Sequence, residues 1–116
     1  MINKRKKLTR IFEVHNILSQ NTSITGNIVT NDDMRFDGYI QGNITSEKKL
    51  VIGEMAVIEG DIKCSHIDCM GKITGNVISA DSVILRATAS LTGNVVTKYI
   101  EIEPGAFFEG SCTMHQ

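Results

Sequence analysis

A short motif recurs through most of this chain and restricts the folds open to it. Close copies are Gly26-Asn27-Ile28, Gly42-Asn43-Ile44, Gly60-Asp61-Ile62, Gly75-Asn76-Val77 and Gly93-Asn94-Val95, with a looser copy at Gly110-Ser111-Cys112. Successive glycines are 16, 18, 15, 18 and 17 residues apart. Apolar and polar residues alternate between them, as in Val51–Ile62, and no helical stretch intervenes. Units of this length with period-two alternation predict an all-β solenoid.

Each unit divides into three short strands whose apolar residues share one parity, and therefore one face. The first strand carries Ile28, Ile44, Ile62, Val77 or Val95. The second carries the pairs Met34/Phe36, Leu50/Ile52, Ile67/Cys69, Val83/Leu85 and Ile100/Ile102. The third carries Ile40, Ile58, Ile73, Leu91 or Phe108, and longer units add Ala56, Ala89 or Ala106. Three inward faces predict a triangular coil of about six turns over residues 21–114, followed by residues 115–116.

Composition agrees with one narrow, aliphatic domain. The 116 residues include no Trp and one Pro, so Ile, Val and Leu must form the core. No apolar run is long enough to span a membrane, and the N-terminal residues do not form a secretory signal. Three cysteines without the spacing of a small secreted domain indicate reduced thiols and a cytoplasmic protein.

The N-terminal segment, residues 1–20, differs from the rest in charge. Five basic residues against Glu13 alone give residues 1–18 a net charge of +4, and seven basic against twelve acidic residues leave −5 for the remainder. Leu8, Ile11, Phe12 and His15 form a weak helical stripe, with Val14, Ile17 and Leu18 as a second one. We predict that this tail binds an anionic membrane surface, through Lys4, Arg5, Lys6, Lys7, Arg10, Ile11 and Phe12. The alternatives are a disordered tail or a segment folded over the open end of the coil.

No motif for a cofactor or for nucleic acid is found. Phosphate-binding, dinucleotide and calcium-repeat patterns are absent, and no Ser, His and acid triple or carboxylate pair can be singled out. Cys64, His66, Asp68 and Cys69 form the one cluster with metal-binding residue types. Strand parity turns both cysteines inward and His66 and Asp68 outward, so we predict buried free thiols and no metal.

An enzymatic alternative rests on His66. Left-handed β-helix acyltransferases use a histidine beside the coil as general base, but they keep a strict six-residue register. Spacings of 15, 16 and 17 do not fit that register. We therefore predict a protein without enzymatic activity and keep the acyltransferase as an alternative.

The C-terminal strands point to self-association. The strands of residues 106–114 carry the apolar residues Phe107, Phe108 and Met114 and run almost to the last residue, and a solenoid end exposes unpaired backbone groups. The simplest partner is another copy, which would continue the coil as a fibre. We predict an interface from Phe107, Phe108, Cys112 and Met114 at one end and Ile24, Ile28 and Phe36 at the other.

Three stretches resemble the bactofilins, which are bacterial polymer-forming cytoskeletal proteins. They are Asn16–Ile28, Met34–Ile44 and Ile102–Met114, and the resemblance covers about Asn16 to Met114. It implies a right-handed parallel β-helix that polymerises without nucleotide into filaments beneath the cytoplasmic membrane. Such filaments would scaffold cell-shape machinery or envelope and cell-wall proteins. A small β-solenoid adaptor that does not polymerise remains a further alternative.

Overall fold

The computed structural model describes residues 16–115, and these residues form sixteen strands without a helix. The first turns contain β2 (Asn16–Leu18), β3 (Ser23–Thr25), β4 (Ile28–Thr30), β5 (Met34–Phe36), β6 (Tyr39–Gln41), β7 (Ile44–Ser46), β8 (Lys49–Ile52) and β9 (Val57–Glu59). The later turns contain β10 (Ile62–Cys69), β11 (Lys72–Thr74), β12 (Val77–Leu85), β13 (Ser90–Thr92), β14 (Val95–Thr97), β15 (Tyr99–Ile102), β16 (Phe107–Glu109) and β17 (Cys112–Met114).

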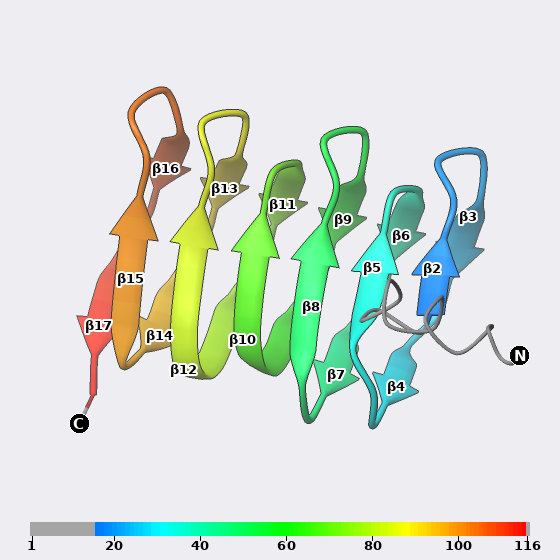
Figure 1. The fold of residues 1–116 in the computed structure, drawn as a ribbon, viewed down its shortest axis with the longest axis horizontal. Coiled ribbons are helices and arrows are strands. Elements are labelled where there is room, and N and C mark those ends of the chain that lie inside the picture. Colours follow the sequence, from blue (N-terminus) through cyan, green and yellow to red (C-terminus); the bar gives the residue numbers. More distant parts are fainter. Residues whose placement is uncertain (1–15, 116) are drawn as a thin grey trace, which may run out of the picture.

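The strands stack in parallel as three faces of one coil of about six turns (Figure 1). The first face contains β4, β7, β14 and β17 with the first halves of β10 and β12. The second contains β2, β5, β8 and β15 with the second halves of β10 and β12. The third contains β3, β6, β9, β11, β13 and β16. The predicted three-strand unit is therefore confirmed.

Figure 1 also shows the hand of the coil. The chain rises through the front strands β2, β5 and β8, crosses at the top and descends behind, while advancing from the N-terminal to the C-terminal end. This sense is right-handed, as the family resemblance implied. A left-handed coil, which the acyltransferase alternative requires, is excluded for the described residues.

The aliphatic core lies inside the coil, where sequence alternation predicted it. Ile44, Ile62, Val77 and Val95 stack along the first face and are almost fully buried. Leu50, Ile52, Ile67, Cys69, Val83 and Leu85 fill the second face, and Ile40, Ile58, Ile73 and Leu91 fill the third. Shorter units have shorter corners, since two residues join β5 to β6 whereas four join β8 to β9.

The coil begins earlier than predicted. Strand β2 pairs with β5 in the register Asn16↔Met34 and Leu18↔Phe36, so residues 16–20 belong to the coil and not to the tail. The helical stripe proposed for Ile17 and Leu18 is therefore wrong. Alternation over three residues is too short to distinguish a strand from a helix end, whereas pairing with a complete neighbouring turn stabilises the strand.

Candidate functional site: the two ends of the coil

The last turn departs from the residue pattern of the turns beneath it. Cys112 of β17 stacks on Val95, in a column that is otherwise Ile or Val. Met114 stacks on Thr97, in a column where Thr30, Ser46 and Ser79 also carry hydroxyls. Phe108 of β16 stacks on Leu91 in an aliphatic column. At the last turn an apolar thioether thus replaces a hydroxyl, an aromatic ring replaces an aliphatic side chain, and a thiol replaces a branched aliphatic side chain.

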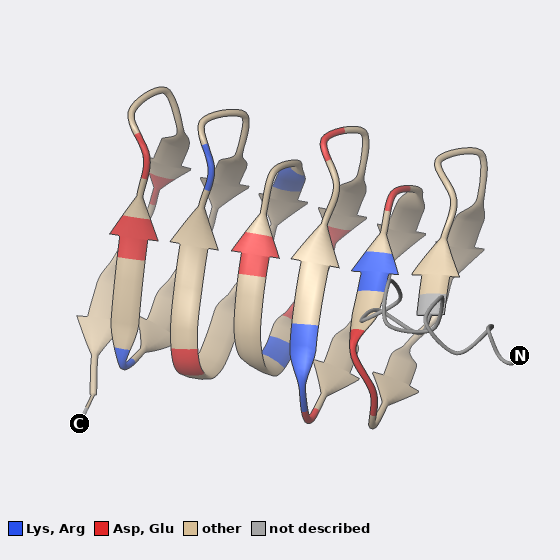
Figure 2. Cartoon of the chain, in the orientation of Figure 1, with Lys and Arg blue, Asp and Glu red and all other residues tan. Residues whose placement is uncertain are grey.

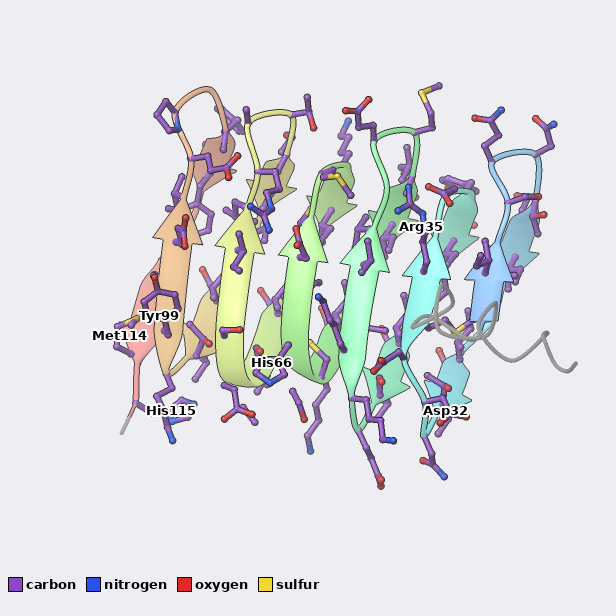
Figure 3. All side chains as sticks on the ribbon, in the orientation of Figure 1. Asp32, Arg35, His66, Tyr99, Met114 and His115 are labelled. Carbon is purple, nitrogen blue, oxygen red and sulfur yellow. The ribbon has the colours of Figure 1, made fainter. Side chains whose placement is uncertain are left out.

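These side chains form an apolar surface at the C-terminal end. Phe107 and Met114 are each 52% exposed, and Tyr99 and Ile102 are also exposed. Figure 3 shows Tyr99, Met114 and His115 together at this end. Phe108 is half-buried and packs against the core, whereas Cys112 is exposed. The four residues predicted at this end are therefore brought together on one end turn.

The N-terminal end has a second apolar surface, but Phe36 is not part of it. Ile24 and Ile28 lie on the first turn and are half-buried, and Ile17, which faces outward on β2 of the same turn, is 62% exposed. Phe36 lies on the second turn beneath Leu18 and is 0% exposed. This position corrects the expectation for Phe36, because a side chain inside the coil cannot contact a second molecule while the first turn is in place.

Both ends also carry an open backbone ladder. Between turns, backbone amides donate to carbonyl oxygens of the neighbouring turn, as where Val95 N–H donates to Ser111 at 2.8 Å and Gly93 N–H donates to Glu109 at 2.9 Å. Within residues 16–115 no further turn covers β15, β16 and β17, nor β2, β3 and β4. The outer edges of these strands thus present polar groups that a strand of another copy can pair.

Asparagines beside the corner glycines build a ladder that sequence analysis did not find. Asn43 N–H donates to Asn27 Oδ1 at 3.0 Å, and Asp61 N–H donates to Asn43 Oδ1 at 2.9 Å. The ladder continues through Asn76 and Asn94 to Ser111. The recurring Asn or Asp is a signal for it, but the partner one turn away follows only from the stacking register.

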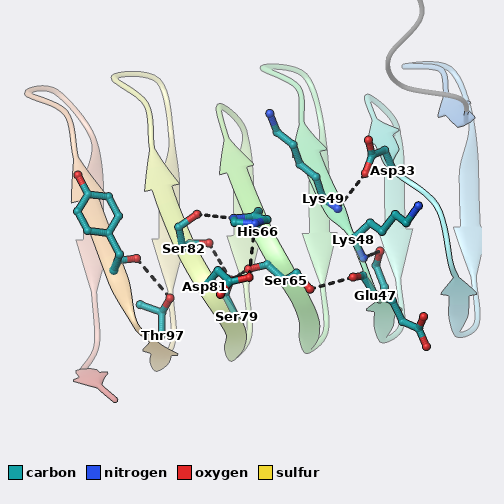
Figure 4. Close-up of polar contacts among 12 residues, drawn as sticks. Asp33, Glu47, Lys48, Lys49, Ser65, His66, Ser79, Asp81, Ser82 and Thr97 are labelled. Atoms are coloured by element: carbon teal, nitrogen blue, oxygen red, sulfur yellow. Dashed lines mark hydrogen bonds and ion pairs between the residues drawn. The ribbon is translucent and has the colours of Figure 1, made fainter. Parts of the chain in front are cut away.

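A second missed column consists of buried hydroxyls at another corner. Ser79 is fully buried, and its hydroxyl, which has one proton to donate, lies 2.8 Å from the carbonyl oxygen of Ser65 and 2.7 Å from that of Ser82 (Figure 4). Thr97 donates to the carbonyl of Tyr99 at 3.3 Å. These bonds satisfy corner backbone groups inside the coil. Met114 cannot donate such a bond, which again distinguishes the last turn.

Ion pairs join several turns along the second face. Arg86 reaches Asp68 at 2.8 Å and Glu103 at 3.0 Å, so one guanidinium bridges three turns. The hydrogen bond from Arg86 lowers the pKa of Asp68, and the bonds to both acids raise the pKa of Arg86. Arg35 pairs with Asp37 at 2.8 Å, and that hydrogen bond raises the pKa of Arg35. The two Arg86 pairs connect neighbouring turns, whereas the Arg35–Asp37 pair lies within one turn.

The cysteines take the predicted inward positions. Cys64 and Cys69 are buried, and desolvation raises the pKa of each thiol to about 12. His66 and Asp68 point outward, so the four do not converge, and the described residues contain no group of three metal-ligating side chains.

The structure does bring a Ser, His and acid set together, which sequence analysis missed. His66 Nδ1 lies 2.9 Å from Ser82 Oγ, and His66 Nε2 lies 3.5 Å from Asp81 Oδ2 (Figure 4). A shift of register between Cys64 and His66 aligns the set. His66 and Asp81 are half exposed, and strand amides here bond to the next turn.

The membrane-binding residues predicted in the tail lie outside the described residues. They are Lys4, Arg5, Lys6, Lys7, Arg10, Ile11 and Phe12. The described residues contain no helix of the length and apolarity that crossing a bilayer requires.

Comparison with known proteins agrees with the coil and its open ends. The family model described as "Polymer-forming cytoskeletal", Bactofilin, matches residues 16–113. Bactofilin BacO of Myxococcus xanthus is 28% identical over 98 residues, which is 84% of this chain and 78% of BacO. Bactofilin BacP of the same bacterium is 23% identical over 110 residues, 94% of this chain and 46% of BacP. No solved structure matches. The family match spans the whole coil, so this chain belongs to the bactofilin family of polymer-forming cytoskeletal proteins.

Proposed function

We propose that this chain is a non-enzymatic scaffold that polymerises without nucleotide through contacts between the ends of its coil. The observation that carries the proposal is the exposed apolar surface of the last turn, formed by Phe107, Met114 and Ile102. The opposite end is also apolar, with Ile17 and Ile24. Burying one such side chain contributes roughly 1.5–3 kcal/mol, and a filament repeats the gain at every joint.

No nucleotide is needed in this proposal, because the driving force is already present in the chain. Apolar burial and pairing of the open strand edges favour the joint at once, whereas the sequence has no phosphate-binding loop. The resulting filament is a passive scaffold. We further propose that it lies at the inner face of the cytoplasmic membrane and organises cell-shape or envelope proteins.

Substitution at the C-terminal end tests the joint. Phe107→Arg and Phe108→Arg place a charge in the apolar surface, so we expect soluble, folded chains that no longer sediment in ultracentrifugation. Val57→Arg is a matched control for Phe107→Arg, because Val57 faces outward in the same column halfway along the coil. Phe107→Arg chains that pellet like wild type contradict the joint. A wild-type chain that stays in the supernatant favours the non-polymerising adaptor.

Deletion of residues 1–15 tests the membrane proposal separately. The basic residues of the tail, from Lys4 to Arg10, should hold filaments on vesicles containing phosphatidylserine. Each Lys or Arg near an anionic leaflet adds about 1 kcal/mol to the binding free energy. We expect the truncated chain to form filaments that no longer float with these vesicles, while the full chain floats. Flotation of the truncated chain would assign the attachment to the coil and refute the role of the tail.

A further inference from the structure

One of the three faces of the coil carries almost no charge. We call the column of outward side chains on the first face, together with the asparagine ladder beside it, the neutral face. The column contains Val29, Thr45, Lys63, Ile78, Val96 and Thr113, and the ladder contains Asn27, Asn43, Asp61, Asn76, Asn94 and Ser111. Figure 2 shows β4, β14 and β17 without charged residues, whereas charges recur along the front strands.

The neutral face is apolar in its outward column. Val29 is 75% and Ile78 is 48% exposed, so two branched apolar side chains project where isolated coils would normally carry charges. A shallow hollow around the third turn is lined by Thr45, Lys63 and Ile78 among others. Every residue of this column except Lys63 is β-branched, and such a row forms a flat surface onto which a like surface can pack.

Only two charged groups lie on this face, and they lie in the same turn. Asp61 accepts the Asn76 N–H at 3.0 Å through Oδ1, which leaves Oδ2 for another donor. Lys63 is exposed, and within residues 16–115 no carboxylate forms an ion pair with it. Both side chains point outward, two residues apart, on adjacent columns. An acid and a base placed in this way fit a partner with the same pair in reverse order.

A second copy of this chain meets that requirement in one arrangement. A two-fold axis parallel to the coil sets each turn against the same turn of the other copy and exchanges the two columns. Asp61 then faces Lys63 of the second copy, and Lys63 faces its Asp61, which gives two ion pairs. Antiparallel coils would instead set Lys63 against Ile78 and Asp61 against Asn76. We infer that the neutral face is a lateral interface between two filaments whose coils run side by side in parallel.

The size of the face makes this contact dependent on the filament, so the inference rests on the proposed function. About six turns spaced by about 4.8 Å and a width of about 10 Å give an area on the order of 300 Å² per chain. Stable interfaces bury about 800 Å² per partner. Single chains should therefore stay unpaired, whereas two filaments add the contact at every subunit and gain avidity.

Charge substitutions on this face test the pairing. Lys63→Asp sets carboxylates against each other, and Asp61→Asn removes the acid while keeping the Oδ1 acceptor, as Asn43 and Asn76 do in their turns. Filament width and mass per length would be measured by electron microscopy at low ionic strength. We expect paired wild-type filaments, single filaments of both variants, and loss of wild-type pairs in high salt. Lys72→Asp on the third face makes the same charge change and should leave pairs intact.

The outcomes separate the two proposals. Pairs that persist in Lys63→Asp, or that are lost equally in Lys72→Asp, overturn the lateral interface. Wild-type filaments that are always single overturn it too, while leaving the end-to-end joint in place. A wild-type chain that forms no filaments contradicts the joint itself, and the lateral interface with it.

Discussion

At the scale of the residue, position along the coil decides what a side chain does. The same inward column holds Val95 beneath Cys112, and the same corner column holds Thr97 beneath Met114. Inside the coil these positions are covered and contribute to stability, whereas on the last turn they are exposed. A side chain that would be covered in the middle of the coil is therefore exposed at its end.

The three cysteines should differ sharply in reactivity. In the folded chain at neutral pH we expect iodoacetamide to modify Cys112 alone, because Cys64 and Cys69 are buried and their pKa is raised to about 12. Mass spectrometry should find one adduct on folded Phe107→Arg chains and three after denaturation. In wild-type filaments Cys112 should become protected. Rapid modification of Cys64 without denaturant would contradict the coil interior.

The same burial predicts how stability depends on pH. The folded thiols keep their protons to about pH 12, whereas thiols in the unfolded chain ionise near their ordinary pKa of 9.0. The folded pKa is raised, so the stabilisation is complete below pH 9 and is lost as pH rises towards 12. Urea unfolding of the Cys64→Ala, Cys69→Ala double variant, compared with wild type over this range, should show a smaller loss of unfolding free energy. An equal loss would mean that other groups cause it.

At the scale of the element, each turn is set by a glycine corner and by the turn beneath. Gly75 has φ of +146°, and a Cβ there would collide with the carbonyl oxygen of Gly60. Gly26 has a similar φ of +137°, but a Cβ there meets nothing, because no described turn precedes it. The close approach at a corner glycine therefore depends on the turn that precedes it.

Alanine at these two glycines separates strain from collision. Gly26→Ala should cost about 1–3 kcal/mol through its backbone angle alone. Gly75→Ala should cost clearly more, because the backbone of two turns must also move apart. Thermal unfolding of both variants in the Phe107→Arg background measures the difference without polymerisation. Equal losses would contradict the close approach of the corners.

The sequence predicts most of the strands but not how they meet. Period-two alternation identifies inward residues such as Ile44 and Leu91, because burial on one side of a strand repeats every second residue. It does not identify β2, which has only three residues. Without β2, Phe36 is expected on the first turn, whereas Leu18 of β2 in fact covers it. The Asn ladder and the set of His66, Asp81 and Ser82 depend on register between turns, and a register shift at Cys64 is not visible in spacing alone.

At the scale of the whole molecule, the coil is a building block with two apolar ends and one nearly neutral side. Its ends fit the polymer-forming character of the family, and its second face carries charged side chains. The strands lie across the coil axis, so neighbouring turns are spaced along it. If coils join end to end, the coil axis becomes the filament axis, and the spacing between turns runs parallel to the filament. In a filament built from contacts between the sides of the coils, the spacing between turns would run perpendicular to the filament axis.

Fibre diffraction from aligned filaments, grown from purified protein without nucleotide, tests the end-to-end joint most directly. The account predicts a reflection at about 4.8 Å along the filament axis, with one subunit for about each 29 Å of length. A 4.8 Å reflection perpendicular to the axis, or a chain that forms no filaments under these conditions, would contradict it.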